Sequence, residues 1–257
     1  MIEKVTGIST VNFGVHAGLN LPYILDRSKR ILRSGDVALL SIEYPLLHVG
    51  DRPSSVLVDY VAFYDPDYRW SRDFDEMARY FFGVDFLTAI FDTAKRWSGF
   101  QAGGILKVER LNHRGDQTGT TASEITPKMQ ARVAASEPLQ IKPLDSVAVA
   151  TALADLMNDA RNKGVRVYAV WPNTLRFPDY ESSAYRTYFQ TVRAYLESFG
   201  VTVLGDPYSA MLSSQEMFDT AYHPNALGRE RRTSRLLQDL CSVIRCSGEP
   251  AVAMAQW

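Results

Sequence analysis

The sequence lacks any large excess of charge of one sign. Its 28 basic and 29 acidic residues leave a net charge of -1 at neutral pH. General binding to nucleic acid needs a concentrated basic surface, so we expect no nucleic-acid partner. A neutral or weakly charged substrate, such as a sugar ester, is compatible with this balance.

Cysteine and histidine are also scarce. The chain has two cysteines, Cys241 and Cys246, and four histidines. The cysteine spacing matches no zinc-binding pattern, and we expect no metal and no cofactor. A disulfide between the two cysteines is disfavoured if the last predicted helix continues through both, in which case Cys241 is a small core residue.

Long apolar runs are missing. No stretch is long enough to span a bilayer, and Met1–Val5 lacks the hydrophobic region of a signal peptide. We therefore predict no membrane span and, for the chain as given, a soluble and by default cytoplasmic protein. The sequence also has no full phosphate-binding loop and no Walker lysine motif, which argues against a nucleotide-binding domain.

What the sequence does contain is an alternation of predicted strands and helices. Apolar runs predict strands over residues 9–13, 35–41, 165–170 and 201–204. Apolar residues at helical spacing predict helices that begin near Pro22, after Asp145 or Ser146, near Tyr185 and after Asn225. Gly164 and Gly200 are the expected C-terminal caps of two of these helices. This order predicts a three-layer, flavodoxin-like α/β fold, with a parallel sheet and helices on both faces.

Residues 64–142 do not follow this alternation, and we predict an insertion of helices and loops there. Residues 72–98 are expected to form two helices interrupted near Gly83, and the polar stretch 113–123 is expected to be an exposed loop. Long insertions often border a functional site. We expect one domain over residues 1–246, followed by a tail over 247–257.

The segment with the clearest chemical potential contains Asp219 and His223, just before the last predicted helix. A carboxylate can fix the tautomer of an imidazole and stabilise the imidazolium that forms when the imidazole takes a proton. Pro224 and Asn225 would start the helix and hold the histidine in place. The alternative is structural: Asp219 caps a turn and His223 is merely the residue where the helix begins.

A second candidate is the loop that contains Gly14 and Gly18, between a predicted strand and a predicted helix. Such a loop can direct backbone N–H groups toward an oxyanion or a phosphate at the carboxyl edge of a sheet. The spacing G-x-x-x-G does not match the dinucleotide pattern G-x-G-x-x-G. From spacing alone, a tight turn explains both glycines.

Taken together, three segments resemble bacterial SGNH (GDSL-like) hydrolases, and in particular a branch of uncharacterised and polysaccharide-associated acyl-transfer proteins. The segments are Asn12-Phe-Gly14 with Gly18, residues 35–44, and Phe-Asp219-x-x-x-His223-Pro-Asn-x-x-Gly228. The resemblance implies a three-layer α/β fold and a Ser-His-Asp site that cleaves or transfers acyl esters. It implies that His223 is the base, that Asp219 is its partner, and that the N–H group of Gly14 or Gly18 is an oxyanion donor.

The sequence departs from the family pattern in two places near the site. Glu43 and Tyr44 stand where the oxyanion asparagine is expected, so Glu43 is a candidate substrate-binding residue instead. The spacing from Asp219 to His223 is one residue longer than the common form.

The third departure concerns the nucleophile, because the first strand of the family and its serine have no counterpart here. Residues 1–7 match the end of the helix that should follow that serine. Other polar residues that we considered are His16, His48, Ser34, Ser41, Ser54 and Ser55. None of these serines lies in the strand-turn-helix context that exposes a nucleophilic hydroxyl. We therefore expect that the chain begins at an internal methionine of a longer protein and that the strands beside the missing one are left unpaired.

The sequence thus predicts a serine-type acyl-ester hydrolase or O-acyltransferase, with a carbohydrate ester as the substrate suggested by the resemblance. The nucleophile is not found in this chain. The alternative is a non-catalytic domain that keeps the fold and binds a ligand without turnover. A longer parent protein would fit a periplasmic or membrane-associated location.

Overall fold

The computed structural model describes residues 1–14, 16–50, 53–65, 67–68 and 111–246. The predicted helices over 72–98 and the predicted tail over 247–257 lie outside these residues, as does most of the predicted insertion.

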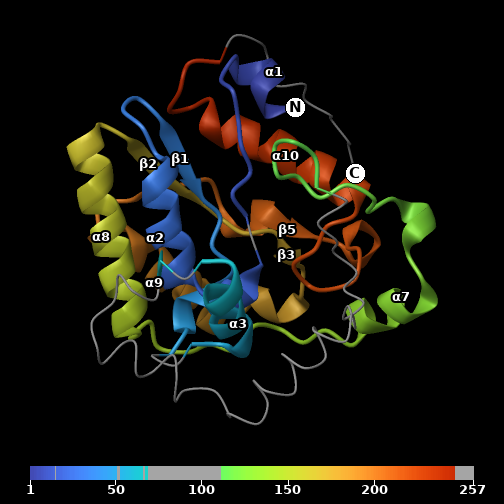
Figure 1. Cartoon of the computed structure of the whole chain (residues 1–257). Coiled ribbons are helices and arrows are strands. Elements are labelled where there is room, and N and C mark those ends of the chain that lie inside the picture. Colours follow the sequence, from blue (N-terminus) through green and yellow to red (C-terminus); the bar gives the residue numbers. More distant parts are fainter. Residues whose placement is uncertain (15, 51–52, 66, 69–110, 247–257) are drawn as a thin grey trace.

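The central sheet has three parallel strands in the order β1 (Val37–Leu40), β2 (Arg166–Val170) and β4 (Thr202–Leu204). The register pairs Val37 with Arg166 and Tyr168 with Thr202. A second parallel pair, β3 (Thr174–Leu175) with β5 (Met211–Leu212), lies near the carboxyl end of the sheet (Figure 1). The carboxyl ends of parallel strands meet at one edge, which is the usual place for a ligand site in such sheets.

Helices cover both faces of the sheet, so the three-layer α/β fold is confirmed. One face carries α2 (Leu21–Ile31), α8 (Val147–Lys163) and α9 (Ser183–Ser198). The other carries α10 (Ala226–Leu240), with α1 (Ile2–Thr6) packed against it (Figure 1). Near the carboxyl edge lie α3 (Ser55–Phe63), α7 (Pro127–Ala134) and short 3-10 helices over 17–19, 44–48, 122–124, 178–181, 207–210 and 214–216.

The main core lies between the sheet and the layer formed by α2, α8 and α9. The helical stripes predicted from the sequence supply it, with Leu153 and Leu156 of α8 and Phe189 of α9 buried against Val167 and Ala169 of β2. Fully burying one such side chain contributes about 1.5–3 kcal/mol. The caps are also as predicted: Ser146 accepts a hydrogen bond at the start of α8, and left-handed backbone at Gly164 ends it.

Two predictions are wrong. Residues 9–13 form no strand: among the described residues, their one backbone–backbone bond is donated by the Asn12 N–H group to the Arg114 carbonyl at 2.7 Å. A strand needs a neighbour to bond with, and the pattern of one segment does not show whether that neighbour exists.

The second error concerns the disulfide, which was disfavoured on the assumption that the last helix continues through both cysteines. Cys241 and Cys246 are joined. Helix α10 ends at Leu240, and the following turn brings Cys246 back to Cys241.

The polar stretch 113–123 was predicted to be an exposed loop; it is part exposed and part half-buried, Thr120 within it is buried, and the short helix over 122–124 begins at its end. A bridge between Leu111 and Gln117 closes the first part of the stretch on itself. None of the helices in the described ranges combines the length and the apolar character needed to cross a bilayer.

Candidate active site

The segment that carries the predicted acid and base is a tight loop over residues 217–224, here called the Asp-His loop. The Phe218 N–H group donates to the His223 carbonyl at 2.7 Å, which closes the loop on itself. The Leu175 N–H group donates to the Ala221 carbonyl at 2.8 Å, and the Asn173 side chain donates to the Tyr222 carbonyl. The loop is therefore fixed to β3 at the carboxyl edge of the sheet.

The start of α10 holds the other end of the Asp-His loop. Buried Asn225 caps the helix by accepting from Gly228 N–H at 3.1 Å, and its amide donates to the Gln215 carbonyl at 2.7 Å. Gly228 leaves room for the Glu216 carbonyl, with which any side chain at position 228 would collide. The motif Asn-x-x-Gly in the sequence thus has a packing reason as well as a capping one.

Within this loop, His223 Nδ1 lies 2.8 Å from Asp219 Oδ1. An ionised carboxylate can only accept, so Nδ1 carries the proton in this bond, and Nε2 of the neutral imidazole keeps its lone pair. The Asp219 side chain is 4% exposed, whereas that of His223 is 38% exposed. A buried carboxylate that orients a partly exposed imidazole is the arrangement that a general base requires.

The second oxygen of Asp219 faces a cation. Arg132 Nη1, from α7, lies 3.8 Å from Asp219 Oδ2. The Arg132 side chain is about half exposed, so solvent screens this pair and its contribution to stability is about 0–1 kcal/mol. The sequence offered no signal for it, since Arg132 lies far from the loop along the chain.

Glu43, three residues beyond the end of β1, interacts electrostatically with His223. Burial raises the pKa of the Glu43 carboxyl, and the charge of His223 acts in the opposite direction.

Tyr222 is the residue before His223 in the Asp-His loop. Burial raises the pKa of its hydroxyl well above the usual value, with smaller contributions from Tyr180 and from Glu43. Tyr222 therefore keeps its proton at neutral pH, and its hydroxyl can donate a hydrogen bond.

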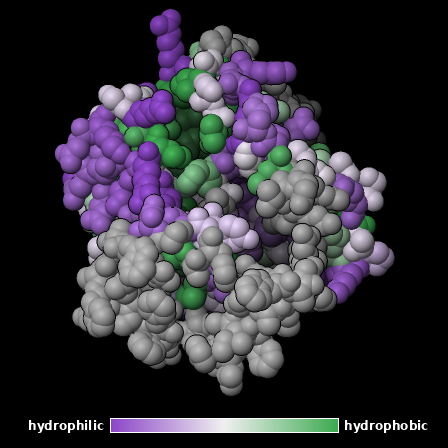
Figure 2. All heavy atoms as spheres, viewed as in Figure 1, coloured by the Kyte–Doolittle hydropathy of each residue, from purple (hydrophilic) through white to green (hydrophobic). Residues whose placement is uncertain are grey.

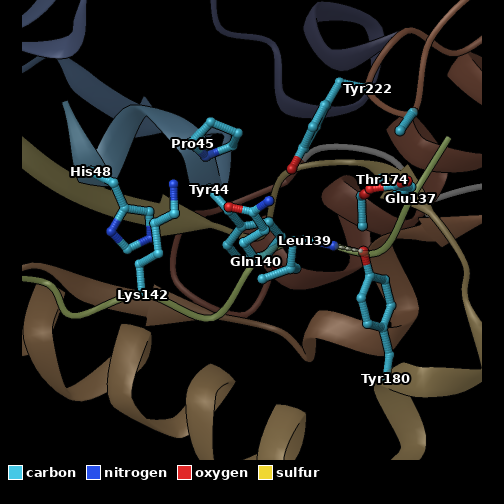
Figure 3. Close-up of a pocket in the computed structure, with 11 residues that line it drawn as sticks. Tyr44, Pro45, His48, Glu137, Leu139, Gln140, Lys142, Thr174, Tyr180 and Tyr222 are labelled. Atoms are coloured by element: carbon cyan, nitrogen blue, oxygen red, sulfur yellow. Dashed lines mark hydrogen bonds between the residues drawn. The ribbon is translucent and has the colours of Figure 1, made fainter.

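A cavity of about 310 Å³ opens next to the Asp-His loop (Figure 3). The tyrosine hydroxyl of Tyr222 points into it, and Figure 3 shows His48 and Lys142 on one side and Thr174 with Tyr180 on the other. Pockets that combine aromatic walls with a few polar groups are typical ligand sites. Tyr222 follows from the sequence only as a neighbour of His223, and His48 was considered as a candidate site residue. Lys142, Thr174 and Tyr180 come from distant segments and were not predicted to line a site.

The N–H groups of Gly14 and Gly18, predicted as oxyanion donors, have partners within the glycine loop. The Gly14 N–H group donates to Asn12 Oδ1, and the Gly18 N–H group donates to His16 Nδ1, both at 2.9 Å. Both groups are thus engaged within their own loop. Their role as oxyanion donors stays a prediction, and it would require a ligand to replace these two bonds.

The remaining candidates take structural places. His16 caps the short helix over 17–19, and His48 bonds to the Pro143 carbonyl and the Tyr188 hydroxyl at 3.0 and 2.8 Å. Ser54 caps α3, while Ser34 and Ser41 are exposed at opposite ends of β1. Across the described residues, no serine hydroxyl bonds to His223, and no group of three His, Cys, Asp or Glu side chains could hold a metal ion.

Comparisons of the chain with protein-family models, with curated proteins and with solved structures gave no match. The fold and the geometry of the site are therefore the grounds for any statement about function.

Proposed function

We propose that the chain carries the base and its partner for acyl-ester hydrolysis or acyl transfer. His223 accepts the proton of an attacking hydroxyl through Nε2 and returns it to the leaving alcohol. Asp219 holds the imidazole in the required tautomer and stabilises its charged form. The observation that carries the proposal is the 2.8 Å bond between a buried Asp219 oxygen and a partly exposed His223 at the carboxyl edge of the sheet. The nucleophile is not assigned to any described residue.

Two neighbouring side chains support this chemistry. The protonated hydroxyl of Tyr222 points into the cavity, where it can donate to the negative charge that develops on the ester oxygen. The Glu43 carboxylate, close enough to His223 for their charges to interact, favours the imidazolium that forms during proton transfer.

The cavity favours a small ester of a polyhydroxylated compound, such as an acylated carbohydrate. Its tyrosines offer flat apolar surface, the Tyr222 hydroxyl points into the cavity, and Lys142 and Thr174 add polar ends. The disulfide is typical of oxidising compartments, so we place the reaction there rather than in the cytoplasm.

Hydrolysis of p-nitrophenyl acetate, butyrate and octanoate tests the proposal. The wild-type chain should hydrolyse the acetate fastest, because the cavity is small, and His223→Ala should reduce the rate about 10²-fold or more. His113→Gln is the matched control, since this histidine is exposed and forms no bond, among the described residues, to Asp219 or to any residue that lines the cavity. Wild-type activity that survives His223→Ala rules out the proposed base.

The alternative is a domain that binds an acylated ligand without turnover. The observation that favours it is that the Gly14 and Gly18 N–H groups already donate hydrogen bonds to Asn12 and His16. Fewer donors are then left for an oxyanion. Calorimetric titration with glucose pentaacetate separates the two functions. Saturable binding with no hydrolysis of any of the three esters supports the binding domain and contradicts the catalytic proposal.

A further inference from the structure

Three successive residues, 173–175, fix strand β3 to the Asp-His loop. The Asn173 side chain donates to the Tyr222 carbonyl. The Leu175 N–H group donates to the Ala221 carbonyl at 2.8 Å. Between these two contacts lies Thr174, which lines the cavity and is 1% exposed. A buried hydroxyl group normally forms hydrogen bonds, so the neighbours of the Thr174 side chain decide what it does.

The neighbours of the Thr174 hydroxyl are two tyrosine hydroxyls. Burial raises the pKa of Tyr180 and of Tyr222, and hydrogen bonding to Thr174 lowers the pKa of both. Figure 3 shows Thr174 with Tyr180 on one side of the cavity, and the Tyr222 hydroxyl points into the cavity. Thr174 therefore connects a buried tyrosine with a tyrosine that can contact a ligand.

The direction of these hydrogen bonds is set by the backbone of Leu139, on the far side of Tyr180. The Leu139 N–H group donates to the Tyr180 hydroxyl oxygen at 3.1 Å, and the Leu139 carbonyl accepts from the Tyr185 hydroxyl at 2.8 Å. An N–H group can only donate, so the proton of the Tyr180 hydroxyl must point to another partner. Tyr180 is 1% exposed, and among the described residues Thr174 is the remaining acceptor for this proton.

The Thr174 hydroxyl, which accepts the Tyr180 proton, keeps its own proton to donate. Tyr222 is the other partner of Thr174, so this proton goes to the Tyr222 oxygen. The proton of Tyr222 is then left for the cavity. The opposite order would leave the buried Tyr180 proton without an acceptor, which is unfavourable. Hydrogen bonds in such a series polarise one another, which makes Tyr222 a stronger donor.

We propose that Thr174 is a positioning residue that keeps the proton of Tyr222 directed at the ligand. The series of hydrogen bonds begins at the Leu139 N–H group and ends at the Tyr222 hydroxyl. The ligand atom at Tyr222 is therefore an oxygen that accepts, and an ester carbonyl, which can only accept, fits this place better than a sugar hydroxyl. The acylated end of the ligand thus binds at Tyr222, an assignment that rests on the proposed function.

The substitutions Thr174→Val and Thr174→Ser separate the hydroxyl group from the size of the side chain. Binding of glucose pentaacetate, which offers ester carbonyls and no donor, is measured by calorimetry with the full chain. Thr174→Val should weaken binding about fivefold or more, and Thr174→Ser should bind like the wild type. Thr151→Val is the matched control and should leave binding unchanged. Thr151 is an exposed residue of α8, and Figure 2 shows mostly hydrophilic side chains where Figure 1 places this helix.

A double-mutant cycle with Tyr222→Phe separates a positioning role from a role in packing. If Thr174 acts through Tyr222, Thr174→Val weakens binding no further when Tyr222 is already phenylalanine. An equal loss of affinity in both backgrounds overturns the proposal, because Thr174 would then act without Tyr222. Wild-type affinity in Thr174→Val also overturns it. Circular dichroism shows that each variant folds.

The hydroxyl of Tyr180 gives a test that needs no ligand. In an equal mixture of H₂O and D₂O, a tyrosine labelled with ¹³C at Cζ gives a pair of carbon signals when its hydroxyl proton exchanges slowly. We expect such a pair for Tyr180 in the wild type and in Thr174→Ser, with the assignment taken from Tyr180→Phe. In Thr174→Val the pair should merge, because the acceptor of the Tyr180 proton is gone. A pair that persists unchanged in Thr174→Val overturns the proposal.

Hydrolysis of p-nitrophenyl acetate by the same variants tests the proposed function separately. Loss of binding in Thr174→Val and recovery in Thr174→Ser, with no hydrolysis by any variant or by the wild type, support the role of Thr174 and contradict the catalytic role of the chain.

Discussion

The bond between His223 and Asp219 makes a prediction about the proton on the imidazole. A hydrogen bond to a charged group contributes about 1.5–3 kcal/mol, and the 38% exposure of the His223 side chain places this one near the lower end. A free-energy difference of about 1.4 kcal/mol between two tautomers corresponds to a tenfold ratio of their populations. Neutral His223 should therefore favour the form protonated at Nδ1 by at least about ten to one. In Asp219→Ala this preference should disappear, because the only described acceptor for Nδ1 is removed.

Two-bond ¹⁵N–¹H NMR correlations measure the tautomer directly, at alkaline pH where the imidazole is neutral. The His223 signals are assigned from a spectrum of His223→Gln, and His16 serves as the reference for the opposite tautomer, because its Nδ1 accepts from the Gly18 N–H group at 2.9 Å. The reasoning is refuted if wild-type His223 is protonated mainly at Nε2. It is also refuted if the populations in the wild type and in folded Asp219→Ala are the same.

Three further predictions concern the donor, the second carboxylate and the disulfide. Tyr222→Phe should lower the rate of p-nitrophenyl acetate hydrolysis about 10²-fold with little change in KM, and a wild-type rate would exclude Tyr222 as a donor to the transition state. Because burial raises the pKa of Glu43, its ionised form destabilises the fold, so Glu43→Gln should raise the thermal midpoint at pH 7–8. That gain should vanish as the pH falls below the usual glutamate range, and a difference independent of pH would contradict the assignment. Replacing Cys241 and Cys246 by serine should cost about 2 kcal/mol in urea unfolding, and the unreduced, unfolded wild type should show no free thiol.

The sequence was informative wherever a structure depends on local pattern. Helix α8, with its Ser146 and Gly164 caps, and strand β2 were found because spacing and capping act within one segment. The proximity of Asp219 and His223 was found for the same reason, since both belong to one short loop.

What the sequence missed depends on distant segments or on the exact end of an element. Whether residues 9–13 form a strand depends on a neighbour, and the disulfide depends on α10 ending at Leu240 rather than a turn later. The contact of Arg132 with Asp219 and the wall formed by Thr174 join segments that are far apart along the chain. No periodic pattern reports such contacts.

The central claim is that Asp219 and His223 act as one unit, and a double-mutant cycle tests it most directly. Rates of p-nitrophenyl acetate hydrolysis are compared for the wild type, Asp219→Ala, His223→Ala and the double variant, each checked for folding by circular dichroism. If Asp219 acts only through His223, the double variant should be no slower than His223→Ala alone. Rate losses that multiply independently would contradict the account.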